Sequence, residues 1–347
     1  MTAVLLHLPV ATAQGGSSIF DDWFGNFWLA LIAKTVVVML FFLVVPLVVG
    51  YIEHKVLAHM QSRLGPMEAG TFHGWAQLVA DGVKFVQKED VVPEAADRGV
   101  FSLAPAVAMI PYIVILVVLP FSPTVFALNL DIGIFFVMAM SSVSVIGVLM
   151  AGWSSANKFS LIGALRAAAQ LIAYELPLVL AAAAVVMQAG SLSLYGIVES
   201  QRGLWNIVRP WQLAGFLIFM VASLAELTRP PFDMPVADSE IIFGAYTEYT
   251  GLKFAFFLLA EYGGIVALSG IAATLYLGGY LGIPGIPLPP PLWMMGKIVA
   301  LSFVVIWLRA TYPRLREDQL QRFSWLALIP LSLVLIMATA VVKVATR

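Results

Sequence analysis

The chain has 347 residues, of which 61% are hydrophobic and only 11% are charged, and its formal net charge is -1 at pH 7. Soluble domains are about half apolar and about a quarter charged, so this composition predicts an all-α, polytopic membrane protein with no basic surface for nucleic acid. The chain contains no cysteine, which excludes a disulfide framework, thiolate-bound iron–sulfur clusters and the common structural zinc sites.

The chain begins with residues 1–25, which we expect to form a loose or amphipathic N-terminal arm. The stretch LLHLPVATA has a short apolar run but no basic residues before it, so cleavage as a signal peptide stays an open alternative. Residues 26–347 are expected to form a single membrane domain. Its first span is predicted at 26–50, longer than the roughly 20 residues that cross a bilayer, and it contains an unusual lysine, Lys34.

A segment that does not span the membrane follows, and residues 71–88 within it have an amphipathic pattern. The apolar positions recur at helical spacing and are Phe72, Trp75, Val79, Val83 and Val86. The polar positions lie opposite them and are Gln77, Asp81, Lys84 and Lys88. This pattern predicts a helix that lies along the membrane surface.

Seven further spans bring the predicted total to about eight. They are predicted at 100–120, 132–152, 163–188, 211–226, 251–279, 293–310 and 325–345. If both termini lie outside, most of the nineteen lysines and arginines fall in cytoplasmic loops or at the adjoining helix ends. The positive-inside rule therefore predicts that the amphipathic helix lies on the cytoplasmic face.

An acid-rich stretch from 225 to 261 stands out in this apolar chain and is also predicted to face the cytoplasm. It holds six of the twenty acidic residues, which are Glu226, Asp233, Asp238, Glu240, Glu248 and Glu261. Glu226, Glu248 and Glu261 are placed to form a path from the loop into the membrane, and Tyr262 could extend it. For Asp238 and Glu240, simple solvation explains the residues equally well.

Glu175 lies near the middle of the fourth predicted span, where an ionisable group costs at least about 2.5 kcal/mol. Such acids are usually functional, so we interpret Glu175 as part of a proton relay. The alternative is a permanently neutral acid that makes a hydrogen bond between helices.

The segment TRPPF (228–232) predicts a rigid loop. Pro230 and Pro231 fix the backbone and force Arg229 out of helical geometry, which suits a docking surface or the wall of a pocket.

Other motifs are missing: the four histidines are too scattered to predict a metal site, and no phosphate-binding or dinucleotide-binding glycine motif occurs. We therefore expect neither ATP nor NADH to bind this chain.

Several ordered motifs together resemble the H subunit family of bacterial proton-translocating NADH:quinone oxidoreductase, respiratory complex I, which is called subunit 1 in mitochondria. They are YIEHKVLAHMQSRLGP (51–66), QLVADGVKFVQKE (77–89), AGWSSANKFSLIGALRAAAQLIAYE (151–175), ELTRPPFDMPVADSE (226–240), AYTEYTGLKFAFFLLAEY (245–262) and RATYPRLREDQL (309–320). The similarity covers nearly the whole chain after residue 26. Two positions depart from the family pattern: His54 replaces the usual arginine, and Val236 stands where an acid is common.

The resemblance implies an eight-span subunit of the bacterial cytoplasmic (inner) membrane, within a multi-subunit complex. Its substrate would be a quinone, either ubiquinone or menaquinone, and flavin and iron–sulfur clusters would sit on other subunits. The implied quinone-chamber residues are Glu53, Gln61, Arg63, Asp81, Lys84 and Asp233. The implied acid path consists of Glu175, Glu226, Asp238, Glu240, Glu248 and Glu261.

The resemblance also implies two groups of partners. Hydrophilic-arm subunits would carry the terminal iron–sulfur cluster and complete the quinone chamber, and small membrane subunits would lead to antiporter-like subunits. Our hypothesis is a coupling subunit in which quinone reduction changes the charge of the acidic loop and reprotonates Glu175 and its neighbours. The alternatives are a quinone-independent membrane anchor of an energy-converting hydrogenase, a stand-alone proton-coupled transporter and an inert scaffold.

Overall fold

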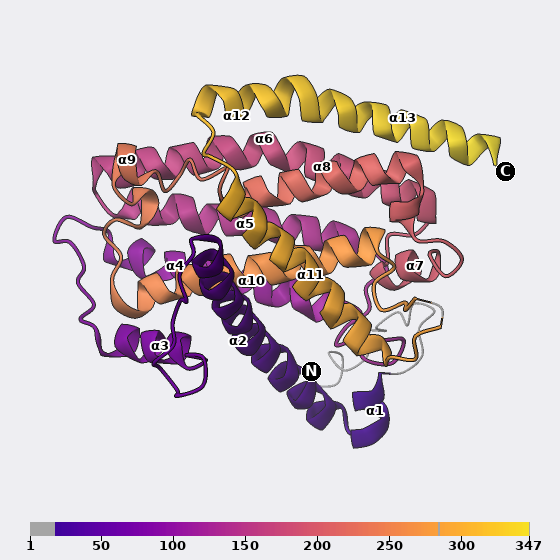
Figure 1. Ribbon diagram of the computed structural model, residues 1–347, viewed down its shortest axis with the longest axis horizontal. Coiled ribbons are helices and arrows are strands. Elements are labelled where there is room, and N and C mark those ends of the chain that lie inside the picture. Colours follow the sequence, from indigo (N-terminus) through magenta and orange to yellow (C-terminus); the bar gives the residue numbers. More distant parts are fainter. Residues whose placement is uncertain (1–17, 284, 347) are drawn as a thin grey trace, which may run out of the picture.

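The computed structural model describes residues 18–283 and 285–346 (Figure 1). Most of the expected N-terminal arm, residues 1–17, lies outside the described residues. The described part has 72% of its residues in helices and no strand. The prediction of an all-α, polytopic membrane protein is confirmed.

Seven helices among the described residues are long and apolar enough to cross a membrane. They are α2 (Phe27–Met60), α4 (Arg98–Val118), α5 (Gly133–Ser154), α6 (Lys158–Ala189), α10 (Gly251–Tyr276), α11 (Pro290–Thr311) and the continuous helix Glu317–Ala345. An eighth apolar helix, α8 (Pro210–Glu226), has only 17 residues. Each of the eight predicted spans therefore coincides with an apolar helix, and the span predicted at 211–226 is the short one.

Two of these helices extend beyond the spans that hydropathy predicts. Helix α2 continues for ten residues past 50, because helical hydrogen bonding persists beyond the apolar stretch and ends only where Ser62 adopts a positive φ of 57°. The last helix begins at Glu317 and consists of α12 (Glu317–Phe323), a π-helical segment (Ser324–Leu328) and α13 (Ile329–Ala345). The polar ends of these helices carry no hydropathy signal and were therefore outside the predicted spans.

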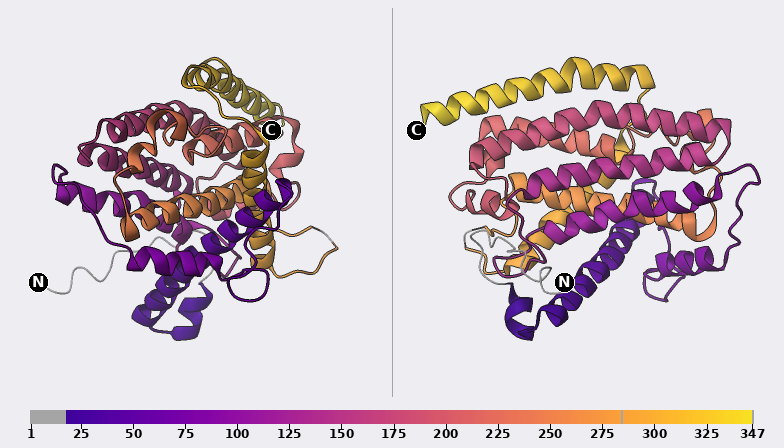
Figure 2. Two further views of the ribbon diagram at one scale, coloured as in Figure 1. Left: turned by 60° about the vertical axis from the view of Figure 1, so that its left-hand side comes forward. Right: turned by 180° about the vertical axis from the view of Figure 1, so that it is seen from behind.

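The helices form a bundle in which α4, α5, α6, α8 and α10 run roughly side by side, while α2 and α11 cross them obliquely (Figure 1). Helix α13 lies along the outside of the bundle against α6 and α8 (Figure 2). Helix α10 is central, because it packs against α2, α4, α8 and α11 and every residue from 263 to 276 is buried. A Cβ atom at Gly263 would lie 2.4 Å from the Phe42 ring, so glycine permits the close approach of α2 and α10.

The remaining helices are short and join the long ones. They are α1 (Ile19–Phe24), α3 (Gln77–Gln87), α7 (Leu194–Glu199), α9 (Asp238–Ile241) and the 3-10 turns Asn206–Val208 and Gly244–Tyr246. Helix α1 explains the unusual Lys34 in the first span, because the Lys34 Nζ donates to both carboxylate oxygens of Asp21 at 2.8 Å. The lysine charge is thus neutralised locally.

The amphipathic helix α3 is shorter than the expected 71–88. Thr71 and His73 have positive φ values of 58° and 53°, which an α-helix cannot accommodate. Phe72 and Trp75 therefore precede the helix instead of continuing its apolar face. The apolar positions within the helix, Val79, Val83 and Val86, are at least half exposed, as a helix lying on a membrane surface requires.

Candidate functional site

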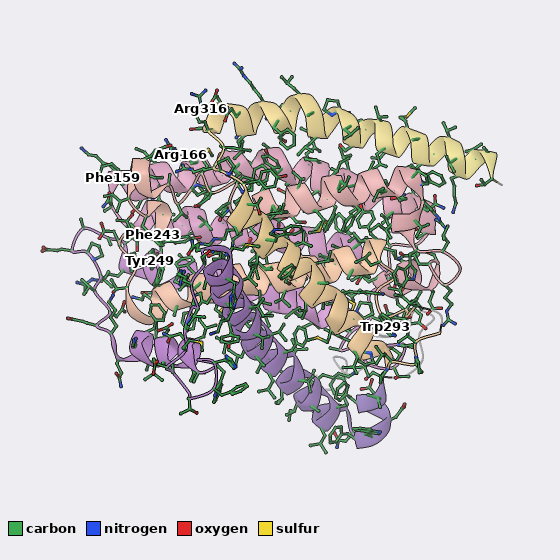
Figure 3. The ribbon with its side chains drawn as sticks, in the orientation of Figure 1. Phe159, Arg166, Phe243, Tyr249, Trp293 and Arg316 are labelled. Atoms are coloured by element: carbon green, nitrogen blue, oxygen red, sulfur yellow. The ribbon has the colours of Figure 1, made fainter. Side chains whose placement is uncertain are left out.

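A cavity of about 280 Å³ lies between α4, α5, α10 and the loop from 227 to 243, and we call it the polar cavity. Its polar lining combines residues that the sequence singled out with others that it did not. The first group is Glu226, Arg229, Asp233, Glu261 and Tyr262, and the second is Tyr112, Ser144, Tyr246 and Arg309. Phe243 also lines the polar cavity. Figure 3 labels this residue and so shows that the cavity lies at one end of the bundle.

Arg229 lies at the centre of a buried ion cluster on the wall of this cavity. Its side chain is 2% exposed, and its Nη1 donates to both carboxylate oxygens of Glu53 at 2.9 Å. The Arg229 Nε lies 2.6 Å from Glu261 Oε1, and Arg309 Nη1 also donates to Glu53 Oε1. Two arginines and two carboxylates therefore neutralise each other where an unpaired charge would be very costly.

The charge state of Arg229 follows from two opposing effects. Burial disfavours the charged guanidinium, but attraction to the carboxylates of Glu261 and Glu53 outweighs burial and raises the pKa of Arg229. The guanidinium carbon also lies 4.7 Å from the centre of the Tyr262 ring, a cation–π distance. Arg229 is therefore a fixed positive charge at physiological pH.

The backbone of the TRPPF loop is held in place by bonds from other elements. The buried Gln170 on α6 donates from its Nε2 to the carbonyl oxygens of Ala225 and Phe232, both at 2.7 Å, so it fastens the loop at both ends. The Leu315 amide donates to the Pro231 carbonyl at 3.0 Å. This loop therefore presents Arg229 to the cavity from a rigid frame.

Two residues of the following segment face the same cavity. Asp233 and Val236 both line it, so the acid expected in the chamber and the position that departs from the family pattern lie in one site. At Val236 an acidic side chain would add a carboxylate to a cavity that already contains Glu226 and Glu261.

Glu226 is the last residue of α8 and is only 8% exposed. Its Oε2 is buried and has no hydrogen-bond partner among the described residues. The Glu226 carboxylate lies near enough to Glu175 to interact with it electrostatically. Glu226 thus lines the polar cavity from the end of α8.

Glu175 itself lies outside the polar cavity. It lines a second, largely apolar groove of about 320 Å³ between α5 and α6, where the Ser142 hydroxyl forms a hydrogen bond with its Oε1. Helix α5 lines both spaces, with Ser142 in the groove and Ser144 in the polar cavity.

The other predicted path acids lie away from the lining of the polar cavity. Glu248 accepts a hydrogen bond from Asn157 just before α10. Glu240 is exposed and pairs with Arg166 and Arg314; the hydrogen bond from Arg166 lowers the pKa of Glu240. Figure 3 shows Arg166 at the end of α6 close to α9. Asp238 begins α9, and its side chain is outside the described part.

The remaining predicted chamber residues lie on the nearby surface. Gln61 and Arg63 occupy the exposed turn after α2, where Arg63 Nε donates to Gln61 Oε1 at 2.8 Å. Asp81 and Lys84 lie on α3, with 3.6 Å between Lys84 Nζ and Asp81 Oδ1. Of the six residues, only Asp233 lines the polar cavity, while Glu53 lies behind it in the ion cluster.

Gln170 and Arg309 are the main site residues that the sequence reasoning missed. Arg309 could not be assigned to the site from the sequence, because its partner Glu53 is 256 positions away in the chain. Gln170 had one available signal, since it is a lone amide among the apolar residues of AAAQLIA. Within residues 18–346, apart from 284, no cluster of histidine and acidic side chains has the arrangement of a metal site.

Comparison with known proteins gives consistent matches over most of the chain. Residues 33–340 match the family described as NADH dehydrogenase. The chain is 45% identical over 316 residues to the H subunit of NADH-quinone oxidoreductase from Dehalococcoides mccartyi strain CBDB1, covering 91% of this chain and 87% of that protein. It is also 45% identical to the corresponding proteins from Geobacillus kaustophilus and Brevibacillus brevis, covering 84% of this chain and 87% of each relative.

Proposed function

The chain belongs to the family described as NADH dehydrogenase, and on this premise we propose that it is the membrane subunit that couples quinone reduction to proton translocation in an NADH:quinone oxidoreductase. It is a multi-pass membrane protein, and its close relatives are subunits of that enzyme complex. We place it in the bacterial cytoplasmic membrane with both termini outside. Its proposed partners are the hydrophilic-arm subunits and the small membrane subunits that lead to antiporter-like subunits.

The polar cavity and its surroundings support the membrane part of a quinone chamber. Apolar walls with a few convergent polar groups are typical of sites that bind small molecules, and the tyrosines and Arg229 could donate to quinone oxygens. Gln61 and Arg63 occupy the turn after α2, and Asp81 and Lys84 lie on the amphipathic helix α3, so we assign these four residues to the route from the membrane. Ubiquinone and menaquinone both fit this chemistry.

The ion cluster supports the coupling role. Reduction of a quinone to a quinol consumes protons, so it changes the charge balance beside Arg229, Glu261 and Glu53. Glu226 shares this cavity and interacts with Glu175. The observation that carries the proposal is that Glu226 lines the same cavity as a balanced cluster of buried charges, with a second acid, Glu175, deep in the neighbouring membrane span. Glu248 and Glu240 are assigned to the cytoplasmic margin of the path.

The chamber assignment is tested by quinone binding in the intact complex. We expect Asp233→Ala and Arg63→Ala to raise the KM for quinone while the complex still assembles, and a photoreactive quinone to label this chain. Arg316→Ala is the control, because Arg316 is exposed and pairs only with Asp318 among the described residues. Unchanged quinone kinetics in both variants, together with no labelling, would show that the chamber lies elsewhere.

The coupling assignment is tested by Glu175→Gln in membrane vesicles. The substitution removes the exchangeable proton but keeps the shape, so we expect proton translocation and coupled NADH:quinone turnover to fall at least about tenfold. Glu199→Gln is the control. Glu199 ends α7 and pairs with Arg202 of the following turn, away from both the polar cavity and Glu175. Normal turnover with normal proton translocation in Glu175→Gln would refute the coupling role.

A further inference from the structure

A second enclosed space lies between α1, α2, the end of α4, the loop after α4 and the start of α11, and we call it the apolar cavity. Its volume is about 260 Å³, and among the described residues that line it Lys34 is the one charged residue. Pro291 and Met295 line it on either side of Trp293, which Figure 3 shows at the opposite end of the bundle from Phe243. Apolar cavities stay free of water and bind apolar molecules, and one of about 150 Å³ already holds benzene. The apolar cavity is therefore large enough for part of a hydrocarbon chain.

Helix α1 folds back onto α2 and covers one side of this cavity. Gly25 ends α1 in a left-handed conformation with a φ of 56°, which glycine adopts at little cost. Asn26 then begins α2, and its side chain accepts a hydrogen bond from the Trp28 amide at 2.9 Å. At the other end of α1, the Ile19 amide donates to the Thr124 carbonyl at 2.9 Å. The short helix is thus held at both ends.

Exposed aromatic side chains place α1 and the start of α2 at the membrane–water interface. Trp23, Phe27 and Trp28 are each more than half exposed, and aromatic belts of this kind occur at the level of the lipid headgroups. Lys34 follows Trp28 by six residues, which is about 9 Å along a helix. Its ammonium reaches back to Asp21 of α1. A lipid chain in the apolar cavity therefore has its polar end beside Lys34 and Asp21.

The Lys34–Asp21 pair keeps bonding capacity on both of its members. An ammonium has three donors, and the two printed bonds of Lys34 both go to Asp21, at 2.8 Å each. The Asp21 carboxylate is 45% exposed and accepts at about four positions. A cationic donor thus lies beside an anionic acceptor, which complements a headgroup with a phosphate and a primary ammonium. A purely anionic headgroup is repelled by Asp21, and a quaternary ammonium has no hydrogen to donate.

We propose that the apolar cavity binds an acyl chain of phosphatidylethanolamine from the leaflet at this end of the bundle. Lys34 donates to the lipid phosphate, and the ethanolamine ammonium donates to Asp21. The bound chain fills the space beside α1 and holds this helix against the loop after α4. The inference is independent of the proposed coupling function, and its test does not depend on proton translocation.

Photo-crosslinking in the intact complex tests where the chain lies. The complex is reconstituted in phosphatidylcholine liposomes with a small fraction of phosphatidylethanolamine that carries a photoreactive group in one acyl chain, and labelled peptides are mapped by mass spectrometry. We expect labelling of residues 116–126, which line the cavity. Ala127→Trp places a large ring in the cavity and should reduce this labelling at least about tenfold. Val36→Phe is the matched control, because Val36 is exposed on α2 outside the lining, and it should leave the labelling unchanged.

The same photoreactive chain on phosphatidylcholine and on phosphatidylglycerol tests the headgroup. Each of these lipids loses the hydrogen bond from the ammonium to Asp21, so we expect about tenfold weaker labelling of residues 116–126. Lys34→Met and Asp21→Asn should abolish the preference for phosphatidylethanolamine. Asp22→Asn should keep it, because Asp22 lies next to Asp21 but forms no ion pair with Lys34 among the described residues.

Three results would overturn the proposal. Equal labelling of the wild-type protein by all three lipids would show that the headgroup is not recognised. Full labelling in Ala127→Trp would show that the chain lies outside the apolar cavity. Stronger labelling of residues 116–126 by a photoreactive quinone with an isoprenoid tail would make quinone the occupant. Because the first and third comparisons use the wild-type protein, they do not depend on the folding of any variant.

Discussion

Two buried cations lie beside different parts of α10 and are neutralised in different ways. Arg229 lies against its first half and is paired with the carboxylates of Glu53 and Glu261. Lys297, on α11, lies beyond its carboxyl end and donates to the carbonyl oxygens of Leu277, Gly279 and Leu281 at 2.6–2.7 Å. Trp293, one turn before Lys297, is at the opposite end of the bundle from Phe243 (Figure 3).

The difference separates a structural charge from one that can take part in coupling. Carbonyl oxygens never titrate, and the three that Lys297 binds belong to the turn that follows α10, where a cation near the carboxyl end of a helix is favourable. The Lys297 ammonium uses its three donors on them and lies 4.3 Å from the Trp205 ring. Carboxylates can gain protons, and those around Arg229 adjoin a cavity, so only the Arg229 cluster can respond to chemistry.

The largest effect is expected from Arg229→Ala. It leaves Glu261 without its cation and Glu53 paired with Arg309 alone, and breaking a buried ion pair costs about 3–5 kcal/mol. We expect a much lower melting temperature of the purified complex and loss of quinone reductase activity. Arg202→Ala is the control, because Arg202 forms an exposed ion pair with Glu199. Its melting temperature should barely change. A wild-type melting temperature for Arg229→Ala would contradict the buried cluster.

The next largest effect is expected from Lys297→Met, which tests the structural role of the Lys297 charge. Lys297→Met keeps the length of the side chain but leaves three carbonyls without their donor, at about 1–3 kcal/mol for a buried unpaired group. We expect a lower melting temperature with an unchanged ratio of protons translocated to NADH oxidised. A reduced ratio at an unchanged melting temperature would show that Lys297 belongs to the coupling machinery.

A more local effect is expected from Gln170→Leu. The change is nearly isosteric and removes the amide that fastens both ends of the TRPPF loop, so Arg229 and Asp233 should lose their fixed position. We expect the KM for quinone to rise about tenfold, equivalent to about 1.4 kcal/mol. Gln212→Leu is a matched control, because Gln212 is equally buried but donates to Ala184 O. Equal effects in both variants would mean that the loop is not special.

The smallest effect is expected from Glu240→Gln. Its carboxylate is 48% exposed, and surface ion pairs contribute less than about 1 kcal/mol. Because Arg166 lowers the pKa of Glu240, this contribution is present above the usual glutamate pKa of about 4.3 and is lost as the pH falls through the lowered folded value. We expect normal proton translocation at neutral pH. A strong loss would place Glu240 on the proton path.

The sequence predicted the parts of this molecule that depend on local patterns. Runs of apolar residues predict all eight apolar helices, because each helix must cover the membrane thickness with apolar side chains. The motifs predicted the family correctly. The start of α3 was not predictable from amphipathic spacing, since the positive φ values at Thr71 and His73 leave no trace in hydrophobicity.

Contacts between distant segments were beyond the reach of the sequence. Nothing in the local pattern pairs Glu53 with Arg309, and the exposed position of Glu240 depends on how the loop from 227 to 250 folds back on α6. The acid-rich stretch was recognised as a group, whereas the structure divides it between the polar cavity and the surface. In the proposed path, Glu226 is therefore the acid that lies between the polar cavity and the membrane span of Glu175.

The most direct test of the account is therefore Glu226→Gln in the complex reconstituted in proteoliposomes. Proton translocation and NADH:quinone turnover are measured together, with Glu240→Gln as the matched surface control. We predict that both rates fall at least about tenfold in Glu226→Gln and stay normal in Glu240→Gln. Normal proton translocation at a normal turnover rate in Glu226→Gln would contradict the path from the ion cluster to Glu175.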